Sequence, residues 1–196
     1  ENPVLDFINT LCNFIVLNLV FLITCLPFFT IGTALSSLYS VVLREARGEY
    51  GYLTRTYLNE FKKNLKSGTS AFLILFFSGA LLFFNLIFWH SMGTVFTSVL
   101  SGLLFVVCVL WFFIFTYTFP LIARFENTTI QTLKNAFFFT MSHTKATLAL
   151  LIIDVFAFCL CFFLAPMKLI MILFGFAFLA YCQSFIFNKI FKPYEK

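Results

Sequence analysis

The chain has 196 residues, of which 61% are hydrophobic and 11% charged, with a mean hydropathy of +0.98 and a net charge of +5 at neutral pH. A soluble domain has roughly 25% charged residues, so this composition excludes an ordinary water-exposed protein. The long uncharged runs predict an all-α, multi-pass membrane helix bundle that forms a single integral membrane domain over residues 1–196.

The first apolar run predicts a span over residues 5–26. Asn9 and Asn13 lie four residues apart on one face of this helix, and Asn18 lies close to the same ridge, which gives the span one polar edge. Two interpretations remain open for this edge. It can form interhelical hydrogen bonds, typically worth about 1 kcal/mol or less in a membrane, or it can line a pathway.

A break between Pro27 and Gly32 follows the first span. Proline removes a backbone donor, and glycine permits backbone angles that other residues resist. At membrane depth such a break needs shelter, so we expect a buried turn that leads into a short helix over residues 33–47. If this helix crosses, the protein has six spans, as we favour, and if it only re-enters, there are five and the N-terminus is outside.

A dense charge cluster follows from residue 44 to residue 66. Within it, Leu58, Phe61 and Leu65 follow the spacing of one helical face, with several lysines beside them. This pattern predicts an amphipathic cytoplasmic helix, which lies along the membrane or docks against a partner.

The remaining elements alternate in the same manner. We expect spans over residues 71–89 and 95–121, a second amphipathic helix over residues 129–141, and two further spans over residues 146–164 and 169–187. The second amphipathic helix has an apolar stripe formed by Ile130, Leu133, Phe137 and Met141.

The basic residues set the expected orientation. Three pairs of crossings place twelve of them on one side and leave Lys168 on the other, and the positive-inside rule makes the first side cytoplasmic. We therefore expect a bacterial plasma-membrane protein with both termini inside. The twelve residues are Arg44, Arg47, Arg55, Lys62, Lys63, Lys66, Arg124, Lys134, Lys145, Lys189, Lys192 and Lys196. Because topology and anionic lipid account for this charge, it does not indicate nucleic-acid binding.

Asp154 is the sharpest chemical feature, because it lies near the middle of the fifth span. A carboxylate at that depth is costly and usually faces the interior of a bundle. It can be a proton or substrate site, or a structural carboxyl held by hydrogen bonds from residues such as Gln183 or the asparagines of the first span. No Lys or Arg is expected at similar depth.

The sequence indicates no enzyme, no catalytic residues, no metal site and no cofactor. His90 and His143 are expected at opposite membrane surfaces, so they cannot share a metal. A glycine loop for phosphate binding is missing, and the six cysteines lie in apolar runs rather than in a disulfide framework.

The first 70 residues resemble the YesL family of small bacterial integral membrane proteins. The resemblance rests on a Leu-Pro-x-x-Thr-Ile-Gly turn, an Ala-Leu-x-x-x-Tyr helix, a Gly-Tyr loop and a Phe-Lys-x-Asn-x-Lys helix. The turn residues are Leu26, Pro27, Thr30, Ile31 and Gly32, and the later segments are Ala34 to Tyr39, Arg47 to Tyr52 and Phe61 to Lys66.

This resemblance implies an accessory role beside carbohydrate ABC importers of Gram-positive bacteria, and it carries over no catalytic residue. The implied partners are the permease subunits, with the ATPase and the sugar-binding protein as further candidates, together with membrane lipid. The candidate partner-contact residues are Leu58, Phe61, Lys62, Lys63, Asn64, Leu65, Leu133, Lys134 and Phe137. The alternatives are an independent transporter or channel for sugar or lipid that uses Asp154 and the Pro27–Gly32 break, or a protein that only stabilises its partner.

Overall fold

A computed structural model describes residues 3–195, with side chains from residue 8 onward. Its helices are α1 (Pro3–Cys25), α2 (Ile31–Glu45), α3 (Leu53–Ser91), α4 (Val95–Arg124), α5 (Thr129–Ser142), α6 (Thr144–Phe163), α7 (Ala165–Ile170) and α8 (Phe176–Phe191). Short 3₁₀ turns cover Phe28–Thr30 and Lys192–Tyr194, and a π-helical segment, Met171–Gly175, joins α7 to α8. Lys196, one of the twelve basic residues, lies outside the described part.

Within residues 3–195, five helical stretches are long and apolar enough to cross a membrane. They are Ile8–Cys25, Leu53–Ser91, Val95–Arg124, Thr144–Phe163 and Ala165–Tyr194. This confirms an all-α, multi-span protein. The short helix α2 is not among the five stretches, so the sixth span is not confirmed.

The short helix α2 is the centre of the fold. It contacts α1, α3, α4 and α8, and its residues from Gly32 to Leu43 are buried apart from Leu35. Small side chains recur every four residues at Gly32, Ser36 and Ser40, which lets neighbouring helices approach closely. The serine hydroxyls donate to carbonyls three or four residues earlier in α2, so their burial leaves no polar group unpaired.

The closest approach joins α2 to α3 at two glycines. A Cβ atom at Gly32 would lie 2.3 Å from the carbonyl oxygen of Gly68, and one at Gly68 would lie 2.6 Å from the Cα of Thr33. The Thr33 hydroxyl bonds the Leu65 carbonyl and the Thr69 hydroxyl beside this crossing. Backbone contact therefore fixes where the two helices cross.

The structure corrects the expected boundary between an amphipathic helix and a span at residue 71. Residues 53–91 form the single 39-residue helix α3. Its helical rise makes it about 58 Å long, which exceeds the roughly 30 Å hydrocarbon core. No proline interrupts this segment, so the helix continues through residue 71.

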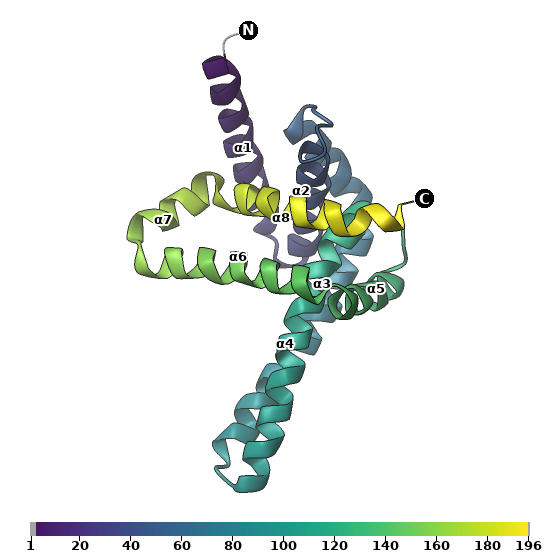
Figure 1. The fold of residues 1–196 in the computed structure, drawn as a ribbon, viewed down its shortest axis with the longest axis vertical. Coiled ribbons are helices and arrows are strands. Elements are labelled where there is room, and N and C mark those ends of the chain that lie inside the picture. The colour runs from purple at the N-terminus through teal and green to yellow at the C-terminus, as the bar shows by residue number, and fades with distance from the viewer. Residues whose placement is uncertain (1–2, 196) are drawn as a thin grey trace.

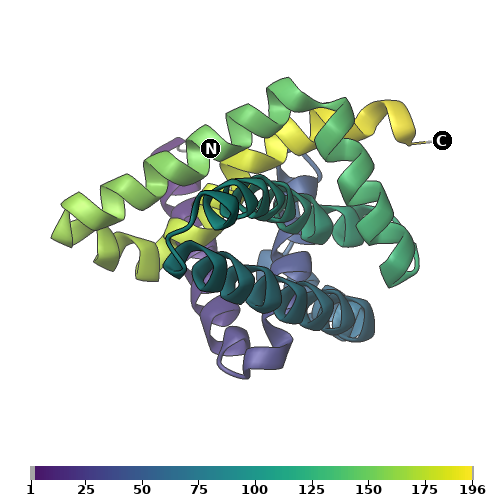
Figure 2. The same cartoon turned by 90° about the horizontal axis from the view of Figure 1, so that it is seen from below.

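The helices do not all run in one direction (Figure 1). In Figure 1 the α3–α4 hairpin projects away from the centre as one arm, while α6 and α8 run across its axis and α1 projects in a third direction. Figure 2 looks along the α3–α4 arm and shows α6 lying across it. Away from α2, α3 and α4 still pack against each other, with Trp111 lying on Gly79 and donating to the Ser78 hydroxyl over 3.0 Å.

The Pro27–Gly32 turn, which was expected to be buried, is buried only in part. Leu26 is 81% exposed and Phe28 is 50% exposed, whereas Thr30 and Gly32 are buried. The Thr30 hydroxyl lies 2.7 Å from the carbonyls of both Thr24 and Pro27. The Thr30 hydroxyl thus links the turn to the end of α1, while Leu26 faces outward and the half-exposed Phe28 packs on Phe72 and Phe76.

Candidate functional site

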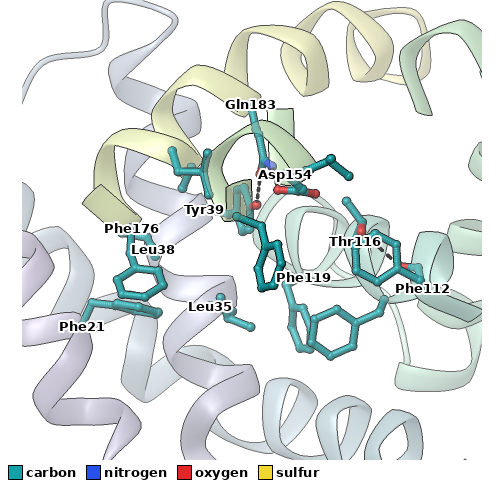
Figure 3. Close-up of a pocket in the computed structure, with 15 residues that line it drawn as sticks. Phe21, Leu35, Leu38, Tyr39, Phe112, Thr116, Phe119, Asp154, Phe176 and Gln183 are labelled. Atoms are coloured by element: carbon teal, nitrogen blue, oxygen red, sulfur yellow. Dashed lines mark hydrogen bonds between the residues drawn. The ribbon is translucent and has the colours of Figure 1, made fainter. Parts of the chain in front are cut away.

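A cavity of about 460 Å³ lies where α1, α2, α4, α6 and α8 meet. Its fifteen lining residues are mostly apolar, and the polar ones are Tyr39, Thr116, Asp154 and Gln183. Figure 3 shows Asp154, Gln183 and Tyr39 close together, with phenylalanine rings at both sides. Three helices far apart in sequence therefore bring one polar group into an otherwise apolar recess.

The polar group is a short chain of hydrogen bonds (Figure 3). The Tyr39 hydroxyl donates to Gln183 Oε1 over 2.5 Å, and Gln183 Nε2 donates to Asp154 Oδ1 over 2.6 Å. Of the two partners considered from the sequence, Gln183 and the asparagines of the first span, it is Gln183 that bonds Asp154. Gln183 and Tyr39 are buried, while Asp154 is half-buried and lines the cavity. The chain fixes the Gln183 amide so that its nitrogen faces the carboxylate.

The cavity offers few polar groups to a ligand. The Gln183 bond uses one oxygen of Asp154, and no Lys or Arg is among the fifteen lining residues. A sugar would bring many hydroxyls, each needing a partner on burial. An amphiphile with one polar group and an apolar body fits such a lining better.

The asparagines of the first span do not act together. Asn18 is completely buried, whereas Asn9 and Asn13 are exposed, so the described chain shows no continuous polar edge. The Asn18 amide donates to the carbonyls of Met171 and Ile172 and accepts from the Ala177 N–H. A side chain inserted into the helical ladder explains the π-helical segment before α8. This matches the structural interpretation of Asn18 rather than a pathway.

The predicted cytoplasmic segments come together on one face, which we call the charged face. Lys63 pairs with Glu126 over 2.6 Å, and Arg124 pairs with Glu195 over 2.6 Å. The Arg47 guanidinium also donates to Asn188 over 3.2 Å. These contacts join residues 44–66, 124–128 and 188–195, three stretches that the positive-inside rule places on the same side.

The candidate partner-contact residues lie on α3 and α5 and differ in how far they are exposed. Leu58, Lys62, Lys63, Leu65, Lys134 and Phe137 are exposed, Phe61 and Leu133 are half-buried, and Asn64 is buried. On α5, the face packed inward carries Thr132, Ala136, Phe139 and Thr140. The predicted stripe of Ile130, Phe137 and Met141 instead points outward. Apolar side chains therefore stand beside basic ones on the outer side of both helices.

Among the turn residues from Leu26 to Gly32, the Thr30 hydroxyl bonds only backbone carbonyls of the same stretch. Within residues 8–195 there is also no group of three His, Cys, Asp or Glu residues placed to hold a metal. The Gly68 contact and the ion pair between Arg124 and Glu195 were missed by sequence reasoning. The four-residue spacing of Gly32, Ser36 and Ser40 was the available signal for a close helix crossing.

The five long apolar helices define the class of protein, a helical membrane protein with several spans. Comparison with family models adds that residues 14–86 match a family described as "Protein of unknown function, DUF624". The match covers less than half of the chain, and it includes every motif of the YesL-like stretch from Leu26 to Lys66. No curated protein and no solved structure matches the chain.

Proposed function

We propose that this protein is an accessory membrane subunit of a bacterial carbohydrate ABC importer that binds or regulates the permease–ATPase complex. The YesL-like motifs support this assignment, and all of them fall inside the range matched by the family model. The role needs a surface for a partner rather than a reaction centre.

The observation that carries the proposal is the row of exposed apolar side chains on α3 and α5, next to the charged face. Leu58, Leu65, Ile130 and Phe137 are each at least 44% exposed, on helices whose inner faces are already packed. Partners commonly dock on such helices through apolar anchors one or two turns apart, with charged residues at the rim. In this role α3 and α5 contact the cytoplasmic side of the permease pair, near the ATPase.

The test is recovery of tagged protein from its native host in mild detergent, read by mass spectrometry. We expect two permease proteins and a sugar-binding protein to be recovered with it. Phe137→Gln should reduce permease recovery, while Phe138→Gln, its equally exposed neighbour outside the stripe, should not. Well-folded wild-type protein recovered without any permease would reject the accessory role.

A strain of the native host that lacks this protein separates regulation of the importer from mere stabilisation of it. If the protein only stabilises the importer, its deletion should lower the abundance of the permease subunits. If it regulates transport, permease abundance should stay normal while sugar uptake changes. Unchanged abundance together with unchanged uptake would argue against both roles.

A second candidate is an independent transporter or channel, which the Asp154 cavity favours. Its apolar lining supports a lipid or another amphiphile more than a free sugar. Reconstituted vesicles should then show lipid or amphiphile movement that Asp154→Asn abolishes and Thr116→Val, on the same cavity wall, only weakens. Vesicles without movement, and an Asp154→Asn strain of normal phenotype, would exclude this function.

A further inference from the structure

A second cavity, of about 580 Å³, lies on the charged face and is separate from the Asp154 recess. It is enclosed by the C-terminal end of α2, the first half of α3, the end of α4 and the connection to α5. Its volume is in the range of roughly 300–1,000 Å³ that is usual for small-molecule sites. We call it the basic cavity.

The lining of the basic cavity has an excess of positive charge. Four cationic side chains and two carboxylates line it, a net of two positive charges. Glu60 pairs with Arg44 and Glu126 pairs with Lys63. The carboxylate partners of the other two cations, Arg47 and Arg124, lie outside the lining. An anion would therefore enter without displacing an acidic residue from the wall.

Arg124 is well placed to bind such an anion. Its side chain is 24% exposed, and the bond to Glu195 uses Nε. Among the described residues no further hydrogen bond is recorded for its two terminal nitrogens, and Arg124 lines the cavity. A guanidinium held in this way presents a planar set of donors that suits phosphate oxygens.

Asn64 supplies an independent observation that points to a ligand. Its side chain is only 7% exposed and lines the cavity, and its Nδ2 has no hydrogen-bond partner among the described residues. Leaving a buried donor unpaired costs roughly 1–3 kcal/mol. Because Nδ2 itself is buried, the amide has to turn toward the cavity before an acceptor bound there can pair with it.

The start of α5 lies at the same wall. Asn127 and the N-cap residue Thr128 line the cavity, and the 14-residue helix begins at Thr129. The first turn of a helix has unpaired backbone N–H groups and carries a partial positive charge. The helix start, the guanidinium groups and the Asn64 amide thus all favour an anionic ligand.

We propose that the basic cavity binds a phosphate group, held by Arg124, by the start of α5 and by the Asn64 amide once it turns toward the cavity. The phosphate belongs either to the headgroup of an anionic phospholipid or to a soluble phosphate ester. Both sources present the same anionic oxygens, and the cavity volume leaves room for the organic part of either. The site does not depend on the accessory role proposed above.

The experiment uses the full chain in neutral detergent and measures binding by calorimetry and by native mass spectrometry. The probes are inorganic phosphate, glycerol 3-phosphate, and phosphatidylglycerol or phosphatidylcholine in mixed micelles. Binding of phosphatidylglycerol without glycerol 3-phosphate assigns a lipid headgroup, and the reverse assigns a soluble ester. If none of the phosphate probes binds, the proposal is wrong.

Three variants locate the site. Asn64→Leu should weaken the binding probe at least about tenfold, while leaving the ligand-free protein as stable as before, because it removes an unpaired donor. Arg124→Gln should also weaken binding, and it serves as a second test if Asn64→Leu folds poorly. Arg55→Gln, an exposed charge change on α3 outside the cavity, should bind normally. Equal affinity in wild type, Asn64→Leu and Arg124→Gln would overturn the proposal.

Discussion

Gly32 and Gly68 bring the backbones of α2 and α3 into direct contact, because a Cβ atom on Gly32 would lie 2.3 Å from the Gly68 carbonyl oxygen. This contact positions the central helix against the longest one. The helices that bear the Asp154 cavity and the basic cavity pack around the same centre, so both cavities depend on it.

Replacement of Gly68 by alanine is therefore expected to destabilise the protein. The new Cβ would meet the backbone of Thr33 at 2.6 and 2.8 Å, and overpacking of this kind costs typically about 1–3 kcal/mol. Thermal unfolding in detergent, followed by circular dichroism, measures the loss. Gly102→Ala on α4 is the matched control, because a Cβ there meets nothing within 4 Å, and its stability should be equal or slightly higher.

Asn18→Leu should lower stability by about 1–3 kcal/mol, since it leaves buried carbonyls and an N–H of the last span unpaired. The affected groups are the carbonyls of Met171 and Ile172 and the amide of Ala177. The same thermal measurement applies. Asn13→Leu, on the exposed part of α1, should have little effect, and equal losses in the two variants would contradict the role assigned to Asn18.

Thr30→Val tests how the Pro27–Gly32 break is stabilised. Valine keeps the shape of the side chain but cannot donate to the carbonyls of Thr24 and Pro27, so we expect a loss of about 1 kcal/mol. The melting temperature should fall for this variant and stay unchanged for Thr144→Val, which alters an exposed threonine on α6. A Thr30→Val protein as stable as the wild type would mean that the turn does not depend on this hydroxyl.

The docking of the C-terminal tail should weaken in acid. The hydrogen bond from Arg124 lowers the pKa of the Glu195 carboxyl below its ordinary value. A group with a lowered folded-state pKa stabilises the fold above its unfolded pKa and loses that effect as the pH falls through the folded value. The difference in melting temperature between wild type and Glu195→Gln should therefore shrink below the ordinary glutamate range.

Glu126→Gln provides the comparison for this pH effect. Lys63 also lowers the pKa of Glu126, but the Glu126 side chain is 84% exposed, against 32% for Glu195. Exposed ion pairs contribute little to stability, so this variant should change the melting temperature less than Glu195→Gln at neutral pH. A larger change for Glu126→Gln would show that the tail is not held by its ion pair.

The sequence by itself determined the class of protein, because the hydropathy of each apolar run and the placement of the charges are local properties. It also predicted a turn at Pro27–Gly32 that leads into a short helix, and it offered Gln183, beside the asparagines of the first span, as a partner for Asp154. A carboxyl in an apolar span needs a donor, and few polar residues occur at that depth, so the choice was small.

The tertiary structure alone decided how the helices meet. Asn18 and Asn13 are alike in sequence, yet only Asn18 reaches another helix, and Asn64 was expected on the outer surface but faces a buried wall. The sequence also did not predict that α3 continues through residue 71 or that α2 crosses it at Gly68. Such features depend on contacts between residues distant in the chain, and the pattern along one helix gives its faces but not the neighbour that each face meets.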